Sequence, residues 1–238
     1  MEGNLDRFRV GTHRTVYYIS DFISEDEENH LIEKVNEAPL SMWKSLKGRR
    51  LQNWGGIVHE KGLLPQNLPP WLTNVTKRIS KESGLFPGDL NHVLINEYLP
   101  NQGIMPHQDG PAYFPVVAII SLGSPAVMDF TPHSRLRTCN STESDNKNAE
   151  TSQKFQVLLM PRSLLIFKDE VYSEYLHGIK EEQVHICDKV INYEQAFGRR
   201  ENDERSLPLL QQTVHRTDTR VSLTCRLVLK VHKNLFRF

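Results

Sequence analysis

The hexapeptide MPHQDG at residues 105–110 places a histidine and a carboxylate two residues apart, just before a long apolar run. In an extended chain, side chains at positions i and i+2 point to the same face, so His107 and Asp109 can converge on one point. A second histidine would complete a set of two histidines and one carboxylate, the facial arrangement that holds non-haem Fe(II). A His-x-Asp pair also arises often by chance in exposed loops, so further residues must support this interpretation.

His177 is the best candidate for the second histidine, because it follows a predicted strand and precedes Gly178. About four strands with their turns fit between it and His107, which is enough chain to return across a small barrel. Two other histidines compete for the role. His133 lies beside a proline in a predicted surface turn, and His185 lies within a predicted strand. We expect both of these to be structural histidines.

The C-terminal stretch RVSLTCRL alternates strictly between polar and apolar residues. Its polar face carries Arg220, Ser222, Thr224 and Arg226. Arginine binds carboxylates through two parallel hydrogen bonds, so a buried strand of this kind could hold a small dicarboxylate. An edge strand with solvated arginines fits the same pattern, and both interpretations stay open. Asn96 and Tyr98 also share one face and could donate hydrogen bonds to a carboxylate.

Two helices are predicted before residue 92, and mostly strands after it. A capping box at Ser24–Glu27 begins the first helix, which ends near Pro39, and the second begins at residues 68–71. The predicted strands are residues 15–19, 92–99, 116–122, 126–130, 155–160, 163–167, 184–191 and 220–232. This order predicts a mainly β fold, a double-stranded β-helix (jelly roll) with flanking helices. Residues 1–91 form an N-terminal α/β extension and residues 92–238 the core of one compact domain.

Composition limits the function classes. The formal net charge is zero, so any nucleic-acid binding must come from a local patch. Three dispersed cysteines form no zinc-finger or disulfide pattern, and no apolar run reaches membrane-spanning length. The charged N-terminus lacks a signal sequence, so we expect a soluble, monomeric protein of the cytoplasm and nucleus. The polar segments 140–154 and 198–205 are expected to be solvated loops.

Taken together, these motifs resemble the AlkB family of Fe(II)/2-oxoglutarate dioxygenases. The ordered set N-x-Y, H-x-D, a distant histidine and R-x5-R spans residues 96–226. The stretches RLQNWGG (50–56), PPWL (69–72) and YLP (98–100) resemble the eukaryotic branch represented by the sixth AlkB homologue, so the similarity covers nearly the full chain. The resemblance implies Fe(II), 2-oxoglutarate and O2 as cofactor and cosubstrates, and oxidative removal of N-methyl groups as the reaction.

Residue by residue, the resemblance implies that His107, Asp109 and His177 ligate Fe(II). Arg220, assisted by Tyr98, would bind the far carboxylate of 2-oxoglutarate. Asn96 and Arg226 would hold its metal-proximal end or orient the ligands. The family's bacterial prototype has asparagine where this chain has Ser222, and an acidic residue where this chain has Pro111. The first change shortens the reach of a hydrogen-bond donor, and the second removes a carboxylate partner for Arg226.

Residues 44–54 are basic and end in an aromatic residue, which suggests a lid that faces RNA or single-stranded DNA. The candidate substrate-binding residues are Lys47, Arg49, Arg50, Trp54 and, beyond the metal motif, Tyr113. Trp54 could instead belong to the core, with the cations simply solvated. Three other functions remain open: a protein hydroxylase or demethylase on the same fold, a nucleic-acid-binding module with low turnover, and a zinc hydrolase. Zinc would leave the two arginines of the C-terminal strand without a role.

Overall fold

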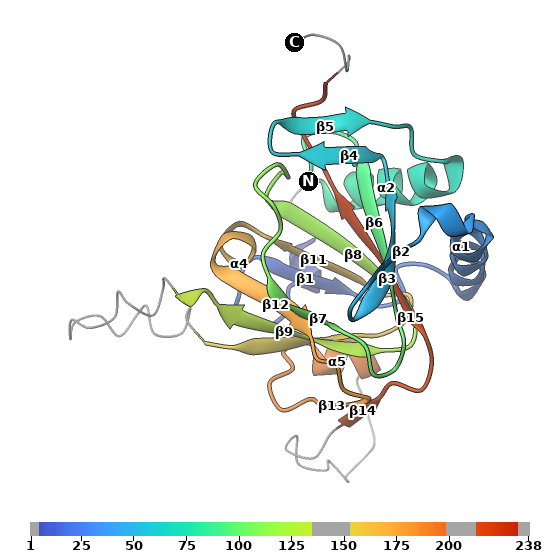
Figure 1. Cartoon of the computed structure of the whole chain (residues 1–238). Coiled ribbons are helices and arrows are strands. Elements are labelled where there is room, and N and C mark those ends of the chain that lie inside the picture. Colours follow the sequence, from blue (N-terminus) through green and yellow to red (C-terminus); the bar gives the residue numbers. More distant parts are fainter. Residues whose placement is uncertain (1–4, 135–152, 199–212, 233–238) are drawn as a thin grey trace, which may run out of the picture.

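The computed structural model describes residues 5–134, 153–198 and 213–232, and two antiparallel sheets dominate it (Figure 1). The larger sheet has the order β1 (Val16–Ile19), β11 (Leu164–Lys168), β8 (Val116–Gly123), β15 (Arg220–Arg226), β6 (His92–Tyr98), β3 (Arg49–Trp54), β2 (Lys44–Leu46). The smaller sheet has the order β10 (Phe155–Leu159), β9 (Ala126–Pro132), β12 (Tyr175–Ile179), β7 (Ile104–His107). Together they form the predicted jelly roll.

The remaining elements are short, apart from two helices. The longer helices are α1 (Glu25–Glu37) and α2 (Pro70–Ser83), and the shorter ones are α4 (Asp169–Glu174), α5 (Tyr193–Phe197), η2 (Asp6–Phe8) and η3 (Leu40–Met42). Two small antiparallel pairs are β4 (Gly56–His59) with β5 (Gly62–Pro65), and β13 (Val184–Ile186) with β14 (Thr213–His215). The predicted capping box is confirmed, because the Ser24 hydroxyl accepts from Glu27 N and the Glu27 carboxylate accepts from Ser24 N.

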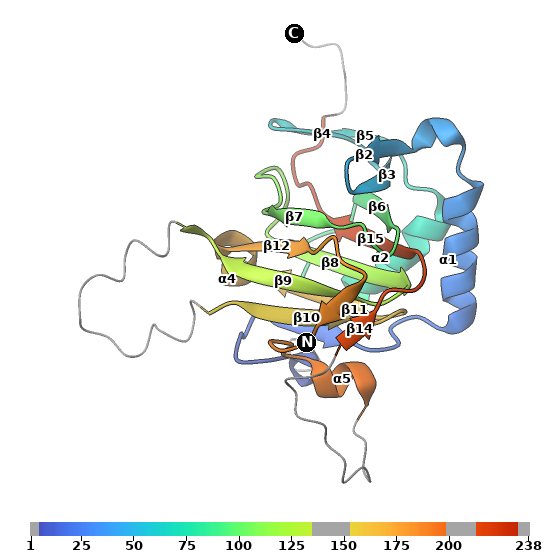
Figure 2. The ribbon, with the colours of Figure 1, turned by 60° about the horizontal axis from the view of Figure 1, so that its bottom comes forward.

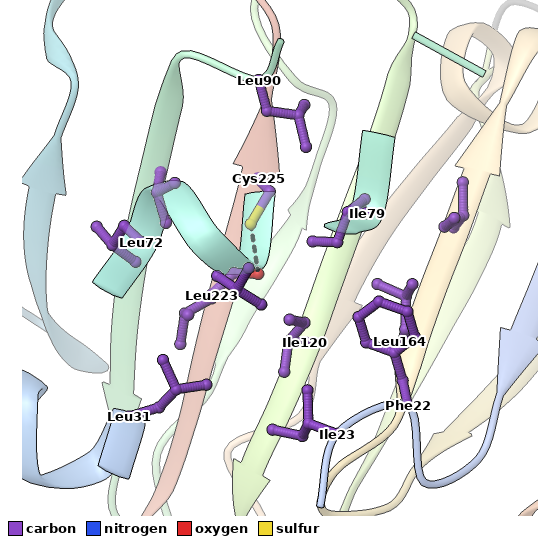
Figure 3. Packing of buried hydrophobic residues seen from close by; sticks show 14 of the residues in the cluster. Phe22, Ile23, Leu31, Leu72, Ile79, Leu90, Ile120, Leu164, Leu223 and Cys225 are labelled. Atoms are coloured by element: carbon purple, nitrogen blue, oxygen red, sulfur yellow. Dashed lines mark hydrogen bonds between the residues drawn. The ribbon is translucent and has the colours of Figure 1, made fainter. Parts of the chain in front are cut away.

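The larger sheet is covered on both faces (Figures 1 and 2). One face packs against α1 and α2, where Leu72 and Ile79 of α2 meet Leu223 and Cys225 of β15 (Figure 3). The other face packs against the smaller sheet in a separate apolar cluster that includes Phe130. A strand buried on both faces must hide its polar side chains as well as its apolar ones.

β15 shows this constraint most clearly, because it lies between β8 and β6 in the middle of the larger sheet. Val221, Leu223 and Cys225 share one face, as the alternation predicted, and that face packs against the helices. The interpretation as an edge strand with solvated arginines is therefore wrong, since all seven residues are buried.

Some predicted strands are shorter in the structure. The segment predicted at residues 184–191 is a strand only to Ile186, after which the chain follows β10 through backbone contacts of Gln156. The segment predicted at residues 220–232 leaves the sheet after Arg226 and reaches β5, where Leu63 pairs with Val231. In both cases local pairing with another element replaces continued sheet hydrogen bonding.

The predicted N-terminal extension and core share one sheet, because β1, β2 and β3 come from residues 1–91 and pair into it. The two predicted polar loops lie outside the described residues, apart from residues 153, 154 and 198. Within the described ranges, none of the helices has the length and apolar character that a membrane crossing requires.

Arg216, just before β15, is fully buried and binds backbone oxygens of two loops. Its guanidinium donates to the carbonyls of Leu99, Gln102, Lys180 and Glu182, at distances of 2.6–3.5 Å. These loops precede β7 and follow β12, so Arg216 fixes the ends of two neighbouring strands. Burial lowers the pKa of Arg216, and the nearby Tyr98 opposes that shift.

We expect Arg216→Met to lower the free energy of unfolding by about 3 kcal/mol or more, because several buried carbonyls lose their donor. Urea unfolding monitored by fluorescence would measure the loss. Arg9→Met is the matched control, since the guanidinium of Arg9 forms a surface ion pair with Asp6 and its side chain is 35% exposed. Equal losses in the two variants would contradict the role of Arg216.

Candidate active site

The two histidines of the predicted metal site face each other across neighbouring strands. His107 of β7 and His177 of β12 are partners in the antiparallel ladder, and their ring centroids lie 4.4 Å apart. Asp109 lies two residues beyond the end of β7. Candidate ligand atoms of the three side chains all lie within 4.8 Å of one another. The structure therefore brings together the three residues that the sequence suggested.

The surroundings of both imidazoles favour their neutral form. The Nδ1 of His107 lies 2.9 Å from the carbonyl of Met105, so Nδ1 donates there and Nε2 keeps its lone pair. Burial lowers the pKa of His107, and it lowers that of His177 to about 3. Phe130 and Phe167 enclose the His177 ring. A metal ligand must be the neutral imidazole, so neither residue has to lose a proton at neutral pH.

Asp109 is held by a buried ion pair with Arg226 from β15. Burial would raise the pKa of Asp109, but its interactions, led by the charge of Arg226, outweigh burial, so the pKa is lowered. One carboxylate oxygen, Oδ1, contacts Arg226; the other, Oδ2, is buried and has no hydrogen-bond partner in the described part of the chain. Two neutral imidazoles and one free carboxylate oxygen are the donor set that fits Fe(II).

The loop that carries Asp109 is also anchored from its other side, by α4. The Gln108 amide donates to the carbonyl of Ser173 at 2.6 Å, and the Tyr172 hydroxyl donates to the carbonyl of Gly110 at 3.4 Å. The role of Tyr172 was not predicted from the sequence, because nothing in the residue order places α4 over this loop. The anchoring limits how far Asp109 can move relative to the two histidines.

A pocket extends from the two histidines between the sheets. All five residues predicted to bind the cosubstrate line it: Asn96, Tyr98, Arg220, Ser222 and Arg226. The apolar wall of the pocket was not predicted from the sequence; it is formed by Leu94, Ile104, Ile119, Met128 and Ile179. Thr224 completes the polar side, where the alternation of β15 had already placed it. A mixed lining of this kind suits a small anion with a short carbon chain.

Arg220 is the strongest attraction for an anion in this pocket. It is 1% exposed, and its one hydrogen bond among the described residues goes to the hydroxyl of Ser121, at 3.1 Å. Burial lowers the pKa of Arg220 to about 10. A buried cation without a carboxylate is costly, so a bound carboxylate would be favourable here. Arg226 differs, because it pairs with Asp109. The proline at position 111, in place of an acidic residue, therefore does not leave Arg226 without a carboxylate partner.

The residues predicted to form a nucleic-acid lid do not share one surface. Arg49 faces the pocket, whereas Arg50 points to the other face of β3, pairs with Glu97 and stacks on Trp43. Trp54 also packs on the far side, against the helical cluster. The prediction of a single lid face therefore needs correction, because alternate residues of a strand point in opposite directions.

Trp54 packs edge-on against Trp71 of α2, with ring centroids 5.7 Å apart, and its indole N–H donates to Gln52 at 2.9 Å. The structure thus places Trp54 with the helices, away from the candidate metal ligands. Lys47 is exposed in the turn between β2 and β3. Tyr113 lies near the site, half-buried, with the Arg226 guanidinium 4.8 Å from its ring centre.

The competing histidines have structural surroundings. His185 is buried, and its Nδ1 accepts a hydrogen bond from the backbone N–H of Val127 at 2.9 Å. The backbone N–H of His133 donates to the carbonyl of Glu174 at 2.7 Å. Neither residue belongs to the group of candidate ligands found in the described part of the chain. The prediction that His185 is a structural histidine is confirmed.

The sequence of this chain is similar to those of proteins from known families. Residues 43–226 match the 2OG-Fe(II) oxygenase superfamily. The chain is 43% identical to a zebrafish (Danio rerio) protein named "Probable RNA/DNA demethylase ALKBH6", over 93% of this chain and 89% of that protein. It is 29% identical to a Xenopus tropicalis tRNA (carboxymethyluridine(34)-5-O)-methyltransferase alkbh8, over 68% of this chain and 24% of the relative.

Solved structures share the fold at low sequence identity. The structure of OsALKBH1 has a TM-score of 0.55 and 14% identity, and the match covers 90% of this chain and 98% of that one. A Pseudomonas putida prolyl-4-hydroxylase has a TM-score of 0.50 and 11% identity, over 91% of this chain and 94% of the other. At these identities the similarity establishes the jelly-roll fold alone.

The buried His92 gives a pH-dependent prediction. Its Nε2 lies 2.6 Å from Asn53 Oδ1, and burial, with the nearby Arg226, lowers its pKa to about 4. Between pH 6.5 and 4 the unfolded chain gains a proton at His92 that the folded protein does not, so stability falls as the pH falls.

We expect His92→Gln to reduce this loss of stability, because glutamine can still donate to Asn53 but does not titrate. Urea unfolding of wild type and variant between pH 4 and 7 would measure the two slopes. The exposed His30 on α1 supplies the control variant His30→Gln. Identical pH slopes for wild type and His92→Gln would contradict the prediction.

The ion pair between Asp109 and Arg226 gives a prediction for both metal binding and stability. We expect Asp109→Asn to weaken metal binding and also to destabilise the metal-free protein by about 3–5 kcal/mol, because it leaves a buried cation unpaired. The double variant Asp109→Asn with Arg226→Met should recover much of the stability but not the metal affinity. Unfolding in a chelator and Mn(II) titration would separate the two effects. A double variant no more stable than Asp109→Asn would show that the unpaired charge is not the cause.

Proposed function

We propose that this chain, which belongs to the AlkB family within the 2OG-Fe(II) oxygenase superfamily, oxidatively demethylates N-methylated bases in RNA or single-stranded DNA. It is a dioxygenase that depends on Fe(II), 2-oxoglutarate and O2. The observation that carries the proposal is a pocket that joins the buried Arg220 to two histidines beside Asp109. Among the described residues, Arg220 has no carboxylate partner and one oxygen of Asp109 has no hydrogen-bond partner. The name of the zebrafish relative supports a nucleic-acid substrate.

We propose that His107, Asp109 and His177 hold Fe(II). Bound Fe(II) would supply the oxidising chemistry with O2 and 2-oxoglutarate: one atom of O2 would enter succinate as 2-oxoglutarate loses CO2, and the other would enter a substrate C–H bond. Asn96 and Arg226 would hold the carboxylate nearest the metal. Arg220, Tyr98 and Ser222 would hold the far one by charge-assisted hydrogen bonds.

The surrounding residues would orient the reactants and keep water away. Ile119 and Met128 form part of an apolar wall between the sheets, where a carbon chain can lie. We propose that Tyr113 stacks on the substrate base, because its half-exposed ring lies over Arg226, the ion-pair partner of Asp109. A base must leave a duplex to reach this depth, so single-stranded substrates are favoured. A hydroxylated N-methyl group would then break down to formaldehyde.

The test is a turnover assay with Fe(II), ascorbate, 2-oxoglutarate and separate pools of methylated RNA, methylated single-stranded DNA and methylated peptides. We expect succinate and formaldehyde to form in equal amounts and to depend on nucleic acid. His177→Ala should abolish both products, and His30→Ala, an exposed helix residue, should leave them unchanged. Products with peptides alone would identify a protein demethylase or hydroxylase and overturn the nucleic-acid proposal. Tight RNA binding without products would identify a binding module.

A further inference from the structure

Arg49 lies in the pocket, and nucleic-acid binding by the basic segment at residues 44–54 does not explain this position. It lies on the same face of β3 as Leu51, the ladder partner of Asn96. It lines the pocket, and its Nε donates to Asn96 Oδ1 at 2.9 Å. This side chain therefore points between the sheets rather than outward to solvent, where a polynucleotide would approach.

The charge of Arg49 acts on groups at both ends of the pocket. Burial is the main cause that lowers the pKa of His107, and Arg49 adds to it. Burial raises the pKa of Tyr98, while Arg220 and then Arg49 oppose that rise. Arg49 lines the same pocket as both of these groups, so its position in the pocket agrees with these effects.

Arg49 also lacks an acidic partner. Its neighbour Arg50 pairs with Glu97, and Arg226 pairs with Asp109, but no ion pair joins Arg49 to a carboxylate in the described ranges. Its Nε is engaged by Asn96, which fixes the direction of the guanidinium and leaves the terminal nitrogens for another acceptor. A half-buried, oriented cation beside an anion-binding pocket is suited to bind part of that anion.

We propose that Arg49 is a third cationic anchor for 2-oxoglutarate: it orients the Asn96 amide through Nε and binds the metal-proximal carboxylate through its terminal nitrogens. The inference rests on the proposed function only through the cosubstrate, and not through the choice of nucleic acid. Arg49 would then contribute to the affinity for 2-oxoglutarate, although it lies outside the motifs at residues 96–226. The competing role is a contact to a nucleic-acid phosphate.

Two variants in the β2–β3 hairpin separate binding of 2-oxoglutarate from binding of a nucleic-acid phosphate. Arg49→Gln removes the inward cation, and Lys47→Gln removes an exposed cation from the adjacent turn. Each protein is loaded with Mn(II) in place of Fe(II), so that no turnover occurs. Calorimetry then gives the Kd for 2-oxoglutarate, and fluorescence anisotropy gives the Kd for a single-stranded RNA at two salt concentrations.

We expect Arg49→Gln to raise the Kd for 2-oxoglutarate by about tenfold or more, as for the loss of a charge-assisted hydrogen bond, and to leave RNA affinity within about twofold. Arg49→Lys should give an intermediate loss, since a single ammonium cannot serve Asn96 and a carboxylate together. Lys47→Gln should not change 2-oxoglutarate binding.

Other results would overturn the proposal. Unchanged 2-oxoglutarate binding with weaker, less salt-dependent RNA binding would assign Arg49 to a phosphate. Unchanged binding of both ligands would show that it has neither role. Melting temperature and Mn(II) affinity without cosubstrate serve as folding controls, and if Arg49→Gln does not fold, Arg49→Lys decides by the same criterion. Because the measurement uses no methylated substrate, its outcome is independent of whether nucleic acid is demethylated.

Discussion

The burial of two guanidinium groups in the central strand is the constraint on which the site depends. Arg220 and Arg226 are 1% and 5% exposed, and each needs compensation that water cannot give. Arg226 receives it from Asp109, which fixes the loop that follows β7. Arg220 has a hydroxyl as its partner instead, so its charge remains available to a ligand. The strand β15 thus positions a candidate metal ligand through Arg226 and favours the binding of an anion through Arg220.

The two sheets contribute different chemistry. The imidazoles come from neighbouring strands of the smaller sheet, whereas the cations come from β15 and β3 of the larger sheet. Asp109 joins the two sets, since it lies beside the histidines and binds an arginine from the opposite sheet. Neither sheet holds a complete site, so packing of one sheet on the other is a condition for activity. The protein's zero net charge is compatible with this arrangement, because the field is local.

Local patterns in the sequence predicted much of this arrangement. The alternation in β15 identified both faces of the strand, and the capping box located the start of α1. The sequence did not reveal that β3 divides the basic segment between two faces, because its strand character was not recognised. Nor did it reveal the role of Arg216, whose partners are backbone carbonyls that belong to every residue type. Long-range contacts of this kind depend on the completed fold and leave no periodic signal.

The position of β15 also constrains how the protein is assembled. In the sheet order, β6 and β8 are neighbours only through β15, although both precede it by about a hundred residues of chain. A growing polypeptide would therefore carry two incomplete half-sheets, each with an open edge, until the last of these strands is synthesised and inserted between them. Pairings over such sequence separations form slowly, and open edges favour aggregation in the meantime. Closure of the sheet and delivery of both buried arginines would then be a single late event.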